Sequence, residues 1–140
     1  KNQDELKEYE SLLRQNLIKP TRAEIFIMSA DGSKKRQLTN NGAANWAPFL
    51  HPNNRQIIVS SNLHDPERRS FSLYLLNIDG TGLERITYDA RFDSFPMFSR
   101  DGKKLVFAST RNAKEPREFN IFIADWVGQA SSLPALHGSQ

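Results

Sequence analysis

A hairpin pattern occurs twice in this chain, 48 residues apart, and this repeat most limits the folds that the chain can adopt. The later copy, 95–109, has a short strand on each side of Asp101-Gly102. We predict a two-residue type I′ turn at this pair, because Asp and Gly both tolerate the positive φ that such a turn needs. Asn53-Asn54 occupies the same place in the earlier copy, and asparagine also tolerates positive φ. Two such hairpins at a fixed offset indicate a tandem repeat.

The repeat extends beyond the hairpins, because 24–71 aligns with 72–119 without a gap. Identical residues fall mostly at turns and strand ends, and apolar character is kept between them. The complete copy is expected to hold four strands, at 46–50, 56–61, 72–78 and 83–87. Four strands in a period of about 40–50 residues are typical of a β-propeller blade. A β-sandwich also has strands about every 8–12 residues, but the turns in register favour the propeller.

The predicted fold class is all-β: a partial β-propeller of about two four-stranded antiparallel blades, with one N-terminal α-helix. We expect the blades within 24–126 and a tail over 127–140. The blade region divides into a partial blade at 24–39, a complete blade at 46–87 and a blade without its last strand at 95–126.

The segment 1–20 is predicted to be an amphipathic helix that runs from Asn2 to Leu17. Asn2 is a suitable N-cap, and Pro20 cannot continue the helix. The apolar stripe at helical spacing consists of Leu6, Tyr9, Leu13 and Leu17. Such a helix either packs on the outside of the propeller or binds a partner, including another copy of the chain.

Two stretches of the blade region resemble the WD-like repeat of TolB-type propellers. One is Pro-Met-Phe-Ser-Arg-Asp-Gly-Lys-Lys-Leu-Val-Phe-Ala-Ser at 96–109, followed by Asn-Ile-Phe-Ile-Ala-Asp at 120–125. The other is Leu-Tyr-Leu-Leu-Asn-Ile-Asp-Gly-Thr-Gly-Leu-Glu-Arg-Ile-Thr at 73–87. The resemblance covers about 24–126 and departs from the pattern at 51–54, where His-Pro-Asn-Asn stands in place of Ser-Pro-Asp-Gly.

The resemblance implies the C-terminal part of a six-bladed propeller. It also implies a protein-binding role in the bacterial envelope, with a periplasmic or other extracytoplasmic location and peptidoglycan-associated partners. One scaffold of this kind serves many functions, so the resemblance specifies the fold more closely than the function.

The composition excludes several classes of protein. The chain has 140 residues and no cysteine, which excludes disulfides and thiolate metal sites. Nineteen basic residues stand against 16 acidic ones, and the signs are interspersed, so we expect no nucleic-acid binding. No apolar stretch approaches the ~20 residues that span a bilayer, and no signal peptide is recognisable.

No pattern in the chain predicts catalysis, a metal site or a cofactor. The histidines are His51, His64 and His137, and no pair has the spacing of a helical metal site. There is no Gly-x-Ser-x-Gly nucleophile elbow and no glycine-rich phosphate loop. We therefore expect no catalytic residue and no enzyme activity.

A candidate binding site can be placed by the repeat alone. Asn45 and Asp93 align with each other just before the innermost strands, and Trp46, Phe92 and Phe95 lie beside them. In a propeller these positions lie near the mouth of the central channel, where polar groups beside aromatic rings suit a peptide or a small ligand. Alternatively, the aromatic side chains pack between blades and the polar ones cap local turns.

The function predicted from the sequence is a non-catalytic β-propeller scaffold for protein–protein interaction. The alternatives are the substrate-gating propeller of a prolyl-oligopeptidase-type peptidase and a small-ligand-binding propeller. Two blades cannot close a ring, and repeats need neighbours that cover their apolar faces. We therefore expect self-association, for example three chains completing a six-blade ring, unless the N-terminal helix covers an open face.

Overall fold

A computed structural model of the chain describes residues 2–15, 21–88, 92–116 and 118–127. Helix α1 (Gln3–Arg14) begins after Asn2, whose side chain accepts a hydrogen bond from the backbone N–H of Asp4. None of its residues is buried. The apolar stripe of the helix stays about half exposed at Leu6, Tyr9 and Leu13. Leu17 lies outside the described residues.

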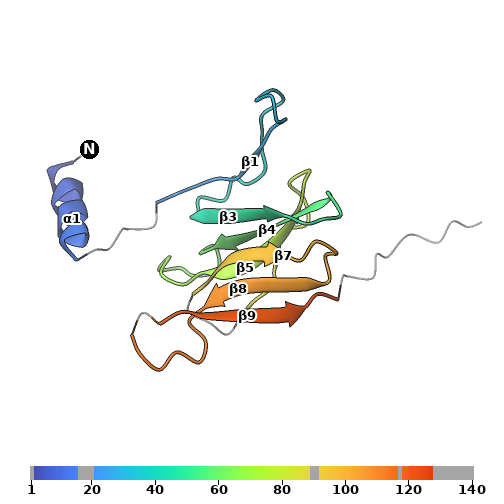
Figure 1. Cartoon of the computed structure of the whole chain (residues 1–140). Coiled ribbons are helices and arrows are strands. Elements are labelled where there is room, and N and C mark those ends of the chain that lie inside the picture. Colours follow the sequence, from blue (N-terminus) through green and yellow to red (C-terminus); the bar gives the residue numbers. More distant parts are fainter. Residues whose placement is uncertain (1, 16–20, 89–91, 117, 128–140) are drawn as a thin grey trace, which may run out of the picture.

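Three antiparallel sheets follow the helix, and Figure 1 shows them in sequence order. The first sheet pairs β1 (Phe26–Ile27) with β2 (Arg36–Gln37). The second sheet is a meander of β3 (Asn45–Leu50), β4 (Gln56–Ser61), β5 (Ser72–Asn77) and β6 (Glu84–Arg85). The third sheet contains β7 (Asp93–Phe98), β8 (Lys104–Ser109) and β9 (Asn120–Asp125). The predicted all-β fold with one helix is confirmed.

The core lies between the sheets, because the central strands are apolar on both faces. Successive side chains of a strand point to opposite faces. Val59 and Leu76 therefore pack toward the first sheet, against Ile25 and Leu38. The residues that pack toward the third sheet come from β4, β5, β7 and β8: Ile58, Leu73, Leu75, Phe98, Leu105 and Phe107.

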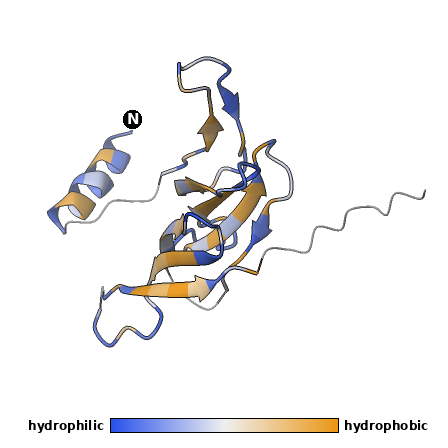
Figure 2. Cartoon of the chain, turned by 45° about the vertical axis from the view of Figure 1, so that its right-hand side comes forward, coloured by the Kyte–Doolittle hydropathy of each residue, from blue (hydrophilic) through white to orange (hydrophobic). Residues whose placement is uncertain are grey.

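The third sheet has only one of its faces covered by described residues. Ile121 and Ile123 of β9 are 70% and 72% exposed. Their counterparts 48 residues earlier, Leu73 and Leu75, are 0% and 4% exposed. Figure 2 shows β9 as a largely apolar strand at an edge of the molecule. The open face of β9 therefore corresponds to a face that is a packed interface in the second sheet.

The turn at Asp101-Gly102 differs from the predicted type I′ turn, so that prediction is wrong. Gly102 has a φ of +70°, but Asp101 does not have a positive φ. The N–H of Gly102 donates to the carbonyl of Ser99 at 2.8 Å, so the glycine closes a four-residue turn. The Asp101 carboxylate accepts from the N–H of Lys103 at 3.0 Å, which holds the aspartate itself in the turn. Only the last position of this four-residue turn, which Gly102 occupies, therefore needs a residue with left-handed φ.

The earlier hairpin repeats this geometry with asparagine in place of glycine. Asn54 has a φ of +56°, and its N–H donates to the carbonyl of His51 at 2.9 Å. Asn53 accepts from the N–H of Arg55 at 2.8 Å, as Asp101 does in the later hairpin. The prediction that asparagine supplies the positive φ is confirmed for Asn54.

Both innermost strands carry a bulge near their start. The register of β3 shifts between Trp46 and Phe49, and that of β7 shifts between Ser94 and Met97. Ala47 and Phe95 take left-handed φ values of 48° and 53° within these bulges. A bulky residue with positive φ is uncommon, and such strain persists only where the surrounding structure enforces it.

Candidate binding surface at the start of the inner strands

The structure places the five predicted site residues at one end of two neighbouring strands. Asn45 and Trp46 open β3, Phe92 and Asp93 lie at the start of β7, and Phe95 forms the β7 bulge. The inner strands pack beside each other, and the hydroxyl of Ser60 in β4 donates to the carbonyl of Asp93 at 2.7 Å. The residues then separate into a buried polar pair, an aromatic row and one exposed ring.

Asn45 is buried and its side chain is fully engaged inside the protein. Its amide nitrogen donates to the carbonyl of Ala23 and to Oδ1 of Asn41, both at 2.9 Å. Its amide oxygen accepts from the hydroxyl of Ser61 at 2.8 Å. The Glu24 carboxylate accepts from the N–H groups of Asn41 and Gly42 beside it. Asn45 thus ties the segment before β1 to the second sheet.

Asp93 is also buried, but it is held by an ion pair. One carboxylate oxygen accepts from Nη2 of Arg111 at 2.9 Å. The Arg111 guanidinium also lies over the rings of Phe107 and Phe122, at 5.2 and 5.7 Å from their centroids. The second carboxylate oxygen, the Ser94 hydroxyl and Nε of Arg111 are buried without a hydrogen-bond partner among the described residues.

The sequence interpretation missed Arg111, although the repeat contained a signal for it. The counterpart of Asp93 is the neutral Asn45, and the counterpart of Arg111 is the neutral Leu63. Both positions change charge together between the two copies, in opposite senses. Such a paired change is what a direct contact between the two positions produces.

Four rings form a continuous aromatic row across this end of the sheets: Trp46, Phe71, Phe92 and Phe119. Trp46 stacks on Phe71 with the centroids 4.8 Å apart. Phe92 contacts Phe71 at 5.4 Å and Phe119 at 5.3 Å. Phe71 is buried, whereas Trp46 and Phe119 at the ends of the row are 39% and 52% exposed. The row is therefore anchored in the core and reachable from solvent at both ends.

Phe95 stands outside this row and is 63% exposed. The bulge turns its side chain outward, so a large ring remains in water on the innermost strand. Tryptophan and other aromatic side chains supply much of the binding energy at protein interfaces, because they bury a large area with few rotatable bonds. Trp46, Phe95 and Phe119 can serve in this way.

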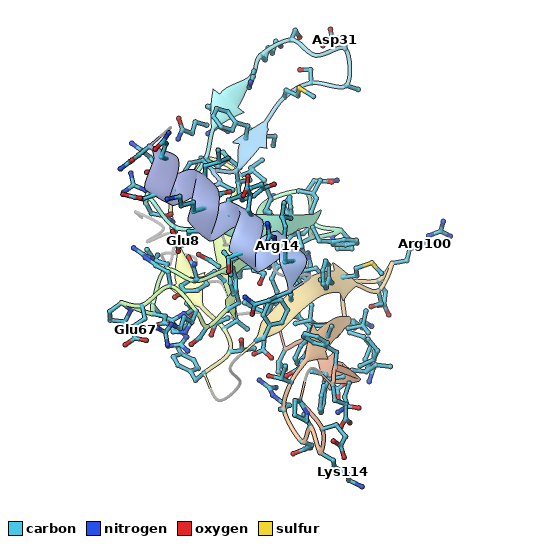
Figure 3. All side chains as sticks on the ribbon, turned by 90° about the vertical axis from the view of Figure 1, so that its left-hand side faces the viewer. Glu8, Arg14, Asp31, Glu67, Arg100 and Lys114 are labelled. Carbon is cyan, nitrogen blue, oxygen red and sulfur yellow. The ribbon has the colours of Figure 1, made fainter. Side chains whose placement is uncertain are left out.

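Two long loops surround this end of the sheets on the left of Figure 1, and Figure 3 labels Glu67 and Lys114 at their tips. In the loop 62–70 the Asp65 carboxylate accepts from the N–H groups of Arg69 and Ser70 at 2.9 and 2.7 Å. The hydroxyl and N–H of Ser70 hold the pKa of the Asp65 carboxyl far below its usual range. The Asp65 carboxylate therefore ties the first part of this loop to its end.

In the loop 110–118 the corresponding hydrogen bonds are accepted by a glutamate side chain at the end of the loop. Glu118 accepts from the N–H groups of Lys114 and Glu115 at 2.7 and 3.0 Å. These two N–H groups, followed by the Asn120 amide, lower the pKa of the Glu118 carboxyl. Both loops thus present a fixed backbone around the aromatic row.

Within the described part of the chain, no three histidine or acidic side chains gather where they could hold a metal ion. The helix found among these residues is too short and too polar to span a bilayer.

Comparison with known proteins relates the three sheets to one architecture. No protein-family model and no curated protein matches the sequence. A structure of a TolB-type protein from Agrobacterium tumefaciens matches 73% of the chain, with 28% sequence identity and a TM-score of 0.61. The chain has the fold of a segment of a TolB-like β-propeller. TolB from Acinetobacter baumannii matches 78% of the chain with a TM-score of 0.62, and its 19% identity supports the fold alone.

The three sheets are thus blades of a partial TolB-like propeller, as the resemblance in the sequence implied. The chain spans 37% and 26% of the length of these two structures. The second blade has four strands, whereas two and three strands are described in the first and third blades. No closed ring is formed by the residues that the structure describes.

Proposed function

We propose that this TolB-like segment is a non-catalytic scaffold for protein–protein interaction that works in the periplasm or elsewhere outside the cytoplasm. The observation that carries the proposal is the open face of the third blade, where Ile121 and Ile123 are 70% and 72% exposed. The similarity to the TolB-type protein from Agrobacterium tumefaciens supports the location. The interaction that this face requires is the contact of one blade with another.

The contact between the second and third blades shows what such a face binds. Leu73 and Leu75 on β5 pack against Leu105 and Phe107 of the next blade, and are almost fully buried. Ile121 and Ile123 occupy the same two positions on β9. Each would contribute about 1.5–3 kcal/mol on complete burial. The occupant that fits is therefore a further propeller blade that supplies two apolar inner strands.

A second open face lies on β1, at the other end of the segment. Phe26 and Met28 are 48% and 61% exposed, whereas their counterparts Tyr74 and Leu76 are 5% and 1% exposed. Two blade faces that the described residues leave open lower the free energy when they pair with those of another copy. We therefore propose that the 140-residue chain self-associates when it is alone in solution.

Light scattering coupled to size-exclusion chromatography tests this proposal across a range of protein concentrations. The expected result is a mass above the 16.0 kDa of one chain, which returns to that of one chain in the double variant Ile121→Lys with Ile123→Lys. Leu83→Lys is the matched control, because Leu83 is 41% exposed and lies beside β6 rather than on the open face. A single-chain mass at every concentration, with a cooperative melt, would refute the proposal.

The aromatic row and Phe95 are a second protein-binding region within the same proposal. The innermost strand of a propeller blade borders the central channel, and Trp46 and Phe95 both lie on innermost strands. Their exposed rings, framed by the two closed loops, suit an extended peptide or protein loop of a partner. Asn45 and Asp93 act as internal supports of this region, because their side chains are buried.

A further inference from the structure

A cavity of about 270 Å³ lies between the second and third blades, at the end of the strands opposite to the aromatic row. It is bounded by the turn that follows β3 and the turn that follows β7. Its lining includes His51, Asn53, Gln56, Leu75, Lys103 and Trp126. The volume lies just below the usual range for drug-sized ligands, about 300–1,000 Å³. A smaller molecule is therefore the size that fits.

The imidazole of His51 lines this cavity and has an unused hydrogen-bond donor. Its Nδ1 accepts from the N–H of Asn53 at 3.0 Å, so the ring proton resides on Nε2. His51 is only 9% exposed, and Nε2 has no hydrogen-bond partner among the described residues. A buried donor without a partner is unfavourable. Gly102 lies against Nε2, where a Cβ atom would be 3.1 Å away, so a ligand that accepts this proton requires a small shift of the Gly102 turn.

Two further donors line the same cavity. The side-chain oxygen of Gln56 accepts from the Asn53 amide at 3.2 Å, which leaves the amide nitrogen of Gln56 to donate. Lys103 adds an ammonium group. Asp101 lies next to it in the chain; its carboxylate accepts from the Ser99 hydroxyl and the N–H of Lys103 and also attracts the Lys103 ammonium. Among the described residues, the lining contains a cationic side chain and no acidic one, so the cavity favours an anion.

The opposite wall of the cavity is apolar and aromatic. Trp126 and Leu75 belong to the lining, and Trp126 packs edge-on against Phe98 at 4.9 Å. His51 contacts the same phenylalanine at 4.4 Å, so Phe98 packs against both His51 and Trp126. An inorganic oxyanion would leave this wall unused, whereas an organic acid uses both sides.

We propose that this cavity is a binding site for a small organic carboxylate with a flat or apolar body. The carboxylate accepts hydrogen bonds from His51 and Gln56 and pairs with the ammonium of Lys103. The body of the acid lies against Trp126 and Leu75. The site is independent of the protein-binding surfaces, because it uses neither the open face of β9 nor the aromatic row.

Gly102 keeps the two turns close enough to form the site. A Cβ atom at Gly102 would lie 2.8 Å from Cε1 of His51, which is closer than real Cβ contacts allow. The bare backbone of this glycine therefore lets the turn of the third blade pack against the imidazole. Any larger residue would push the ring toward the cavity or separate the blades.

Calorimetric titration of the 140-residue chain with benzoate tests the proposal, with benzamide and inorganic phosphate as the other two probes. Saturable benzoate binding is expected in the millimolar range or tighter. Benzamide keeps the ring without the charge, and phosphate keeps the charge without the ring, so both should bind at least about tenfold more weakly. Benzamide binding equal to that of benzoate, or no benzoate binding at all, would overturn the proposal.

Variants locate the site. Lys103→Met is expected to weaken benzoate binding by about tenfold, as loss of one charge-assisted hydrogen bond does. Arg100→Met is the matched control, because this cation belongs to the same turn but points away from the protein body in Figure 3. His51→Phe keeps an aromatic ring and removes the donor. Equal affinities of the Lys103→Met and Arg100→Met variants would show that benzoate binds elsewhere.

Discussion

The second and third blades are built from the same repeat, yet equivalent strands in them meet different surroundings. Leu73 of the second blade is 0% exposed, and its counterpart Ile121 in the third blade is 70% exposed. Both side chains point to the same side of equivalent strands. The difference therefore comes from the neighbouring blade and not from the strand itself. A repeat can specify its strands locally while its stability depends on what lies next to it.

The buried polar residue at the start of the innermost strand also differs between these two blades: it is Asn45 in the second blade and Asp93 in the third. Asn45 in the second blade exchanges hydrogen bonds with the hydroxyl of Ser61 and the side chain of Asn41, and its amide also donates to the Glu24 carboxylate at 3.4 Å. Asp93 in the third blade pairs with Arg111, which comes from the loop of its own blade. The Asn45 side chain therefore contacts the preceding segment, whereas the Asp93 side chain pairs with a residue of its own blade. The repeat thus tolerates two chemical solutions at one position.

Truncation of the two equivalent apolar residues should give the largest difference between the blades. Leu73→Ala should lower the free energy of unfolding by about 2–5 kcal/mol, because it leaves a cavity in a packed core. Ile121→Ala should change it by less than about 0.5 kcal/mol, since its side chain is already in water. Urea unfolding of the dilute chain measures both. Similar losses in the two variants would mean that the face of β9 is covered.

Removal of the Asp93–Arg111 pair should have an intermediate effect. Asp93→Asn alone should destabilise the chain by about 1–3 kcal/mol, because it leaves a partly buried guanidinium without its counter-charge. Adding Arg111→Leu recreates the Asn–Leu combination of the second blade and should recover part of that loss. A double-mutant cycle in urea yields the coupling energy. Strictly additive losses would contradict a direct interaction.

The pH dependence of the loop 62–70 should be the smallest effect. The pKa of Asp65 is lowered in the folded protein below its unfolded value of about 3.9, chiefly by the Ser70 hydroxyl. Its contribution is therefore complete above that value and is lost as the pH falls through the lower folded-state pKa. Hydrogen exchange should show the amides of Arg69 and Ser70 losing protection in this acid range.

In the Asp65→Ala variant these amides should be unprotected even at neutral pH, because alanine has no side-chain acceptor for their hydrogen bonds. Glu67→Gln is the matched control in the same loop, since Glu67 makes only an exposed ion pair with Arg69. The loop 110–118 is held by Glu118 instead and should keep its protection in both variants. Retained protection at Ser70 in Asp65→Ala would show that the carboxylate does not close the loop.

Much of the fold could be predicted from the sequence because the repeat records local geometry. Strand β9 lies where the repeat placed it, and Asn54 takes the positive φ expected of a turn residue. The type I′ turn was wrong because the Asp101 side chain satisfies the N–H of Lys103, which favours a longer turn. Local sequence alone does not show which of two compatible turns the side-chain hydrogen bonds select.

The candidate site was predicted less completely, because its contacts join residues far apart in the chain. The pairing of Asp93 with Arg111 and the stacking of Trp46 on Phe71 depend on how strands and loops meet at one end of the blades. The aromatic row therefore includes rings that periodicity assigns only to strand ends. His51 was interpreted as a turn residue, and only the approach of Gly102 from the next blade makes it part of a cavity.

Isolated parallel β-bridges join neighbouring blades, and they determine where this protein can be lengthened or shortened. Phe71 bridges to Phe92, and Ala23 bridges to Ala44, so each inner strand begins on the backbone of the previous blade. A blade is therefore not a separable module bounded by the loop before its first strand. An engineered array should be cut just before the first residue of a bridge, as at Ala23 and Phe71, so that both partners of each bridge lie in one unit.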